Sequence, residues 1–435
     1  MTPLMPPLRN NPILVIAATL LLCWSLCLVF IPFVHSDEAN PDQPFILTPK
    51  AKELHQRALV IDGHNDLPWL MRMEAHSSVE EIDIGQSVPD FHTDIPRLKQ
   101  GGVDAQFWAA FVRSNEPNAA RNTLEQIDLI HRMVDRYPDT FAFALKADDV
   151  IEISNQGKIA CLIGVEGGHS IENSLPLLRM YYRLGVRYMT LTHADSLAWA
   201  GASTDGTELS GLSDFGKEVV LEMNRLGMLV DISHVSVNTM IDTLEVSQAP
   251  IIASHSSAFN IAPHPRNIPD AVLEKIADNG GVVMVNFFSG FIDPDAAVDL
   301  LERTEVPQRL RKEYPNEEEY QAELAKWLNA RRQRLSENGG FRSDVGGLVD
   351  HIDHIVKVAG IDHVGLGSDY DGISSVPRNL EDVSTFPNIT QELLNRGYCE
   401  KDILKILGGN TLRAMREAEK VAEILAIKGL SQPNP

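Results

Sequence analysis

One pattern recurs eight times between residues 58 and 367 and limits how this chain can fold. In each repeat a short apolar, β-branched run ends in polar or charged residues, and a stretch with the composition of a helix follows. The runs are 58–61, 103–112, 159–165, 186–192, 228–232, 250–254, 281–288 and 363–367. Nearly continuous apolar strands that alternate with helices indicate a parallel sheet covered on both faces. Eight such units predict a closed (β/α)8 barrel rather than an open sheet.

The spacing is interrupted between the seventh and eighth runs, around residues 290–350. The stretch Glu317–Glu337 is rich in Glu, Ala, Leu, Arg and Gln, which favours a helix with a solvated surface of mixed charge. We therefore expect a helical insertion here. Because the sequence has no second domain, repeat or low-complexity tract, residues 37–435 are predicted to form one α/β domain, a TIM-like barrel.

The N-terminal segment differs from the rest of the chain. From Pro12 to Val34 there is no charged side chain, and Arg9 precedes this run. Such a run is long enough to cross a bilayer, and the positive charge before it favours translocation of everything that follows. Residues 1–36 are therefore expected to be a cleaved signal peptide or an uncleaved membrane anchor. Either alternative places residues 37–435 outside the cytoplasm, periplasmic, secreted or attached to a membrane through this segment alone.

The composition limits the partners and the redox chemistry of the chain. The formal net charge of −22 argues against nucleic acid or an anionic membrane surface as partner, because both require a basic patch. Only Cys161 and Cys399 lie beyond residue 36, too few for a disulfide scaffold. Cys161 sits in an apolar run and is expected to be a buried free thiol, although a single bridge between the two cysteines is left open.

Histidine and acidic residues stand where the predicted strands end. His64 and Asp66 follow the first run two residues apart, so in extended backbone both point the same way. The third, fourth, fifth, sixth and eighth runs are followed by Glu166, His193, His234, His255 and Asp369. A (β/α)8 barrel brings the carboxyl ends of its strands together on one face, where barrel enzymes hold their functional groups. These seven residues are thus predicted to converge.

Imidazoles and carboxylates are the ligands that zinc accepts where one position stays open for water. The cluster has enough of them for two metal ions about 3.5–4 Å apart, and Glu166, at the middle strand end, is the candidate bridge. A lone histidine at a strand end is usually an ordinary polar residue, but seven such residues in barrel order make coincidence improbable. His351 and His354 precede the last strand and are interpreted as surface residues, whereas His169 lies close enough to Glu166 to support it.

Six segments together resemble one known family, the membrane (renal-type) dipeptidases or M19 peptidases. They are VIDGHNDLPW at 60–69, VEGGHS at 165–170, LTH at 191–193, DISHVS at 231–236, SHSSA at 254–258 and GLGSDYDG at 365–372. Their fixed order, within a resemblance that covers roughly residues 50–420, is far more specific than any one segment. The resemblance implies a metal-dependent hydrolase on a (β/α)8 barrel, a zinc dipeptidase with two zinc ions per chain.

The same resemblance implies how the metals are held. His64 and Asp66 would bind the first zinc ion, His234 and His255 the second, and Glu166 would bridge the two. A hydroxide held between the metals would attack the peptide bond of a dipeptide.

The resemblance also implies how the substrate is held. His193 would contact the substrate carbonyl, and Asp369 would pass a proton to the leaving amine. Arg266 would grip the C-terminal carboxylate, and a bidentate grip at a fixed distance from the reacting bond would measure substrate length. Members are often homodimers, and some accept a D-residue at the C-terminal position. Animal members carry a C-terminal lipid anchor; residues 432–435 are not hydrophobic, so membrane attachment is expected only through the N-terminal segment.

Two other interpretations fit part of the pattern. Another dinuclear barrel hydrolase, such as a deacetylase or lactonase, would commonly bridge its metals with a modified lysine, but no lysine ends a predicted strand. A catalytically silent metal-binding receptor would be expected to lack a ligand or Asp369, and none is missing. The dipeptidase interpretation is therefore preferred.

Overall fold

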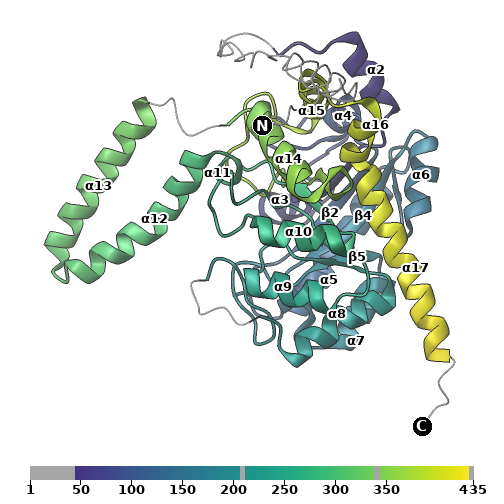
Figure 1. The fold of residues 1–435 in the computed structure, drawn as a ribbon, viewed down its shortest axis with the longest axis horizontal. Helices are drawn as coiled ribbons and strands as arrows, with labels where there is room; N and C mark the ends of the chain where they lie inside the picture. Colours follow the sequence, from purple (N-terminus) through teal and green to yellow (C-terminus); the bar gives the residue numbers. More distant parts are fainter. Residues whose placement is uncertain (1–44, 206–210, 338–342, 431–435) are drawn as a thin grey trace, which may run out of the picture. The chain divides into compact units, whose positions relative to one another are not determined.

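Eight parallel strands close into a barrel in the computed structural model, which describes residues 45–205, 211–337 and 343–430 (Figure 1). Neighbouring strands pair in the order β2-β1-β9-β8-β7-β6-β5-β4, and the pairing of β2 with β4 closes the sheet. The strands are β1 (Ile61–Asn65), β2 (Ala105–Phe111), β4 (Ile159–Glu166), β5 (Val186–Thr190), β6 (Leu229–Asp231), β7 (Ile252–Ala253), β8 (Val282–Val285) and β9 (Val364–Leu366). The predicted barrel is confirmed.

Two features of the sheet differ from the sequence prediction. The first strand does not end before Asp62 but continues to Asn65, because its polar side chains are buried and the strand pairs there with β2 and β9. A ninth strand, β3 (Phe141–Phe143), pairs with the start of β4 and was not predicted. Its apolar run, 141–145, has no β-branched residue, and such residues marked the eight runs that were recognised as strands.

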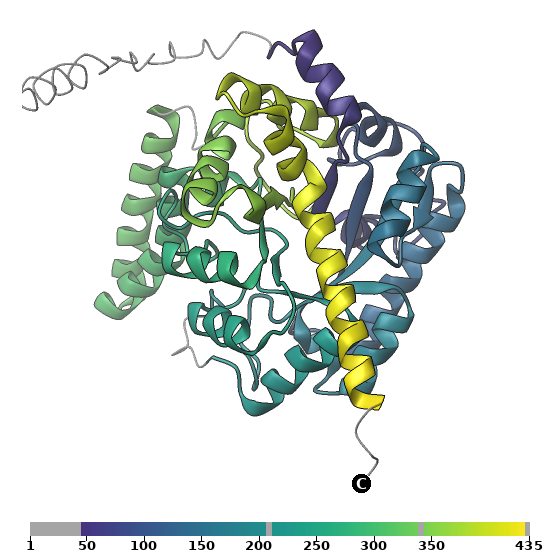
Figure 2. The ribbon, with the colours of Figure 1, turned by 45° about the vertical axis from the view of Figure 1, so that its right-hand side comes forward.

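Helices cover the outer face of the barrel (Figure 2). They are α2 (Pro49–Arg57), α3 (Leu67–Glu74), α4 (Ile95–Gln100), α5 (Ala119–Arg136), α6 (Ala147–Asn155), α7 (Leu175–Arg183), α8 (Asp214–Leu226), α9 (Val237–Val246), α10 (Asp270–Asn279), α11 (Ser289–Ile292), α12 (Pro294–Glu313), α13 (Glu317–Glu337), α14 (Val345–Ala359), α15 (Phe386–Asn395), α16 (Glu400–Leu404) and α17 (Asn410–Leu430). Helix α8 shows the local signals: the Ser213 side chain accepts from the N–H of Gly216, and Gly227 ends the helix with a φ of 79°.

The stretch that was expected to be a helical insertion forms α12 and α13, a helical hairpin that projects from the barrel (Figure 1). Over residues 317–336 no side chain of α13 is buried. Polar contacts attach it to α12: Arg331 donates to both carboxylate oxygens of Asp299 at 2.7 and 2.8 Å, and Arg334 donates to Glu302 at 2.6 Å. Charge pairs therefore contribute to the hairpin, together with the buried Val306 and Leu310 of α12.

The interior of the barrel is filled with apolar side chains, among them the fully buried Phe107, Leu162 and Met284. A filled interior leaves space for functional groups only at an end of the barrel. Cys161, in β4, is a buried free thiol whose pKa is raised by burial to about 12. Cys399 is exposed and also free, so the bridge that the sequence left open is absent.

The chain divides into two units, residues 1–46 and residues 47–435. The first lies almost wholly outside the described residues, and with it the hydrophobic run 12–34. Within the described ranges, no helix combines the length and the apolar character needed to cross a membrane.

Candidate metal centre and active site

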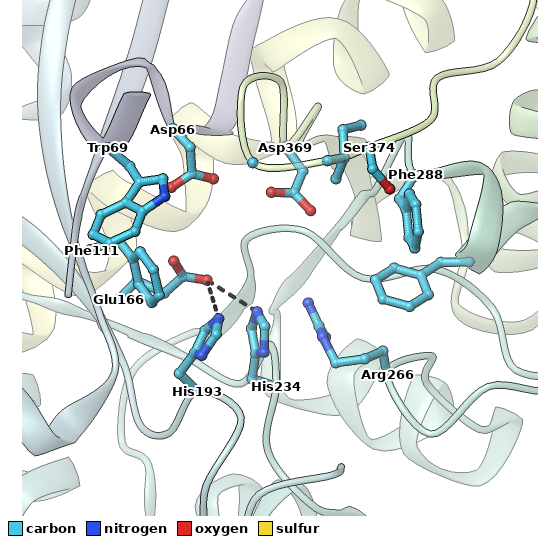
Figure 3. Close-up of a pocket in the computed structure, with 13 residues that line it drawn as sticks. Asp66, Trp69, Phe111, Glu166, His193, His234, Arg266, Phe288, Asp369 and Ser374 are labelled. Carbon is cyan, nitrogen blue, oxygen red and sulfur yellow. Dashed lines mark ion pairs between the residues drawn. The ribbon is translucent and has the colours of Figure 1, made fainter. Parts of the chain in front are cut away.

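The strand-end residues come together at the carboxyl end of the barrel (Figure 3). His64 lies on β1, Glu166 ends β4, and Asp66 stands at the start of α3. The remaining four follow β5, β6, β7 and β9 in order: His193, His234, His255 and Asp369. All seven border one centre, because parallel strands of a closed barrel end on the same face.

The Glu166 carboxylate lies between two groups of side chains. Its Oε2 is 3.7 Å from His64 Nε2, which is also 3.2 Å from Asp66 Oδ2 and 4.0 Å from Asp369 Oδ1. Its Oε1 is 3.0 Å from His234 Nε2 and 3.4 Å from His255 Nε2. In each of three sets, the possible ligand atoms lie within 4.8 Å of one another: those of His64, Asp66 and Asp369, those of Glu166, His193 and His234, and those of His64, Glu166 and His255. The two oxygens of one carboxylate thus face two separate sets of ligands.

The imidazole nitrogens and carboxylates of the centre are arranged as the ligands of a metal ion would be. His64 Nε2 is buried without a hydrogen-bond partner, and the Nε2 atoms of His234 and His255 face each other at 2.9 Å. Burial holds the pKa of His234 and of His255 well below its usual range, so both imidazoles are neutral, the form that binds a metal. Orphaned imidazole nitrogens that converge on buried carboxylates are what a divalent cation would satisfy.

The buried carboxylates of the centre would also be stabilised by a nearby positive charge. Burial raises the pKa of Glu166 and of Asp369, since two carboxylates without counter-ions are costly to keep ionised in the interior. Burial alone would lower the pKa of His64, but the charges of Glu166 and Asp66 outweigh it and raise that pKa to about 10. These carboxylates are therefore stabilised by positive charge, which the protonated His64 ring supplies and which a bound cation would also supply.

Two of the site residues adopt a left-handed backbone that non-glycine residues rarely use. His234 has a φ of 67° and Asp369 a φ of 61°, and each such conformation costs on the order of 1–3 kcal/mol. The Asp369 N–H donates to the His64 carbonyl at 3.0 Å, which ties β1 to the loop after β9. The fold therefore retains strained backbone where two ligand-bearing side chains turn toward the centre.

A cavity of about 320 Å³ lies over this centre. Trp69 and Phe111 line one side, and Phe288 and Arg266 line the other (Figure 3). Phe291 also lines the cavity and packs against Phe288, with ring centroids 4.8 Å apart. Arg266 is 3% exposed. It donates to Ser256 Oγ at 3.2 Å and to the His255 carbonyl at 3.1 Å, whereas its Nε has no partner. The cavity thus offers apolar walls and one buried guanidinium with a free donor.

Several residues of the site were not assigned a role from the sequence. Asn286 donates to Asp369 Oδ2 at 2.8 Å and so fixes that carboxylate. The aromatic walls Trp69, Phe111, Phe288 and Phe291 were also missed. Their positions close to the predicted strand ends were the available signal, but a side chain's direction depends on the turn that follows the strand.

The structure contradicts part of what was predicted for the other histidines. His351 is not a surface residue: it is fully buried, accepts from the Ala258 N–H at 3.0 Å and lies 3.1 Å from the Ile292 carbonyl. A helix face turned toward the barrel leaves a histidine no solvent, so its ring binds two backbone groups. His354 pairs with Asp270 at 2.6 Å. The described hydrogen bond of His169 runs to the Val112 carbonyl at 2.9 Å rather than to Glu166.

Comparison with known proteins identifies the family. The family model of the membrane dipeptidases, peptidase family M19, matches residues 48–428. The chain belongs to this family. The resemblance carried by the six sequence segments is therefore confirmed, and the protein is a hydrolase of the metallo-dipeptidase class. An uncharacterized dipeptidase of Schizosaccharomyces pombe is 39% identical over 395 residues, which cover 87% of this chain and 84% of that protein.

Solved structures of M19 peptidases have the same fold. The probable dipeptidase PvdM from Pseudomonas aeruginosa superposes with a TM-score of 0.73 at 26% identity, over 86% of this chain and 98% of that one. A metallo peptidase from Rhodobacter sphaeroides, solved with a phosphinate mimic of the dipeptide L-Ala-D-Ala, gives a TM-score of 0.66 at 23% identity, over 83% and 99%.

Proposed function

We propose that this M19 protein hydrolyses the peptide bond of dipeptides with two zinc ions per chain. The observation that carries the proposal is the Glu166 carboxylate, whose Oε2 faces His64 at 3.7 Å while its Oε1 faces His234 at 3.0 Å and His255 at 3.4 Å. A carboxylate with one ligand set on each side is the arrangement that a dinuclear site requires.

The residues present fit the two ions. His64 and Asp66 would hold the first, His234 and His255 the second, and Glu166 would bridge them. When bound, the ions supply the Lewis acidity that activates water and polarises the scissile carbonyl.

Arg266 binds the C-terminal carboxylate of the substrate in this proposal. Its guanidinium is buried beside the cavity with an unpartnered Nε, so a carboxylate there meets a donor that nothing else satisfies. Charge-assisted hydrogen bonds to a buried arginine are strong and directional. A C-terminal residue held at Arg266 leaves the neighbouring peptide bond over the metal ligands, which selects dipeptides over longer chains.

His193 and Asp369 act on the reacting groups. Burial lowers the pKa of His193 to about 3, so its neutral ring can donate an N–H to the carbonyl oxygen as charge develops there. Asp369 is held through Oδ2 by Asn286, which leaves Oδ1 free to accept a proton from the attacking water and to deliver it to the leaving amine.

Three further properties belong to the same proposal. A D-residue is accepted at the C-terminal position. The metallo peptidase from Rhodobacter sphaeroides was solved with a mimic of L-Ala-D-Ala, which supports such acceptance in that relative. The protein acts as a homodimer outside the cytoplasm, and residues 1–36 direct its export as a cleaved signal or as an anchor. Residues 37–435 then form the single catalytic domain.

A substrate panel tests this function. The purified protein, supplied with zinc, should cleave L,L- and L,D-dipeptides but not a tripeptide, an ester or a phosphotriester. Cleavage of an ester or of an N-acetylated sugar, with dipeptides untouched, would replace the dipeptidase by another dinuclear hydrolase. No turnover of any substrate by a zinc-loaded protein would favour a silent receptor.

A further inference from the structure

Asp231, the last residue of β6, is a buried carboxylate outside the ligand set, and hydrogen-bond donors occupy both of its oxygens. Oδ1 accepts from the backbone N–H groups of Ser233 at 3.0 Å and of Ser254 at 2.8 Å. Oδ2 accepts from the hydroxyls of Ser254, at 2.7 Å, and Thr190. All four contacts are donors, so this carboxylate fixes the direction of every hydrogen bond that reaches it.

The bond to Asp231 determines which ring nitrogen of His255 carries a proton. Ser254 has one hydroxyl hydrogen, and the charged acceptor takes it. The Ser254 oxygen, 2.7 Å from His255 Nδ1, must therefore accept from an Nδ1–H. The neutral ring then presents the Nε2 lone pair to the metal centre. This matters because Glu166 Oε1, 3.4 Å from Nε2, would by itself favour the tautomer with Nε2 protonated.

The ligand histidine on the other side of the centre has a different partner. The fully buried Tyr188 hydroxyl lies 2.7 Å from His64 Nδ1. This contact holds the ring so that Nε2 faces Asp66 at 3.2 Å and Glu166 at 3.7 Å.

We propose that Asp231 is a positioning residue that, through Ser254, sets the tautomer of His255 so that this ring presents Nε2 to the metal centre. The inference rests on the proposed metal site. It links a ligand of the second zinc ion to a buried anion on the neighbouring strand.

A glycine on the neighbouring strand β4 leaves space for the Tyr188 ring. Gly164 on β4 lies opposite Tyr188 on β5, and a Cβ at Gly164 would come within 2.0 Å of the Tyr188 ring. Any larger residue at position 164 would clash with the Tyr188 ring, so glycine there is required for the contact between Tyr188 and His64.

Asp231→Asn is the sharpest test, because the fold dictates how the new amide must lie. Two backbone N–H groups surround Oδ1, so the amide oxygen has to occupy that position and the NH2 group has to face Ser254 and Thr190. Ser254 then accepts from the amide, and its hydroxyl hydrogen turns to His255 Nδ1. We expect His255 to change to the Nε2–H tautomer and zinc affinity to fall by about 10- to 100-fold.

Two readouts separate this inference from the function on which it rests. Ring-nitrogen NMR of the zinc-free, full-length protein reports the His255 tautomer directly, and competition with a chelator reports zinc affinity. Ser254→Ala removes the hydroxyl between Asp231 and His255, so it should release the His255 tautomer and weaken zinc binding. Asp104→Asn, a carboxylate bound to a backbone N–H and a serine at the opposite end of β2, should change neither readout.

An unchanged His255 tautomer and wild-type zinc affinity in a folded Asp231→Asn protein would overturn the inference. If that variant does not fold, Ser254→Ala decides, since it removes one hydroxyl and an unchanged His255 tautomer would contradict the network. Failure of the wild-type protein to bind zinc would refute the dinuclear function, while the His255 tautomer of the zinc-free protein would still test the network.

Discussion

Arg266 is the residue on which substrate length depends in this account. Replacing Arg266 with alanine should lower kcat/KM for dipeptides by about 10- to 100-fold through KM, because hydrogen bonds to a charged group contribute roughly 1.5–3 kcal/mol. Steady-state kinetics on a dipeptide and on the matching dipeptide amide, which lacks the carboxylate, measure this. Equal losses on both substrates would show that Arg266 supports the fold of the site rather than the carboxylate.

His351 gives a residue-scale prediction about stability. Burial lowers its pKa in the folded protein from 6.5 to about 4, so between these values the unfolded chain binds a proton that the folded chain does not. Unfolding free energy should therefore fall as pH decreases from 6.5 to 4, by up to about 1.4 kcal/mol per pH unit from this group. Denaturant titrations should show a shallower pH slope in His351→Gln, and an unaltered slope would contradict the assignment.

At this scale the sequence predicted which residues meet but not how they are held. His64, Glu166 and Asp369 were found because strand ends converge in a barrel. The role of Asp231 was missed, since a tautomer depends on partners that only the folded chain brings together: Asp231 and Ser254 are 23 positions apart. Arg266 was found through the resemblance alone, because a loop arginine carries no pattern of its own.

Among the elements, the α12–α13 hairpin is the part least bound to the barrel. Arg331→Ala removes the bidentate contact with the buried Asp299 and leaves that carboxylate unpaired. Hydrogen exchange in α13 should become faster while the barrel strands keep their protection, because residues 317–336 contribute no buried side chain. The neighbouring exposed Arg332→Ala is the matched control. Faster exchange across the strands as well would mean that the hairpin supports the whole fold.

The bounds of the helices and strands were predicted with unequal success. Helix α13 has the predicted bounds, since twenty-one residues of helix-forming composition give a strong signal. Strand β3 was missed because its apolar run, 141–145, has no β-branched residue, unlike the eight runs that were recognised. The end of β1 was misplaced for a different reason: its last residues are polar, and only their burial at the metal centre makes them part of a strand.

For the whole molecule, topology rather than local chemistry builds the site. The ligands come from the ends of four strands, β1, β4, β6 and β7, and the pairing of β2 with β4 closes the barrel that brings them together around Glu166. The barrel could be predicted because eight strand–helix units leave few alternatives. The position of Glu166 between two ligand sets could be proposed only as a consequence of that closure.

Zinc content measured on the wild-type protein and on Glu166→Gln tests the central claim most directly. After dialysis against trace zinc, elemental analysis should give about two zinc ions per wild-type chain. Glu166→Gln should retain at most one and lose dipeptide turnover, because a neutral amide is a poor bridge between cations. A wild-type chain without tightly bound metal, or a Glu166→Gln protein with two zinc ions and full activity, would contradict the bridging carboxylate and the dinuclear mechanism built on it.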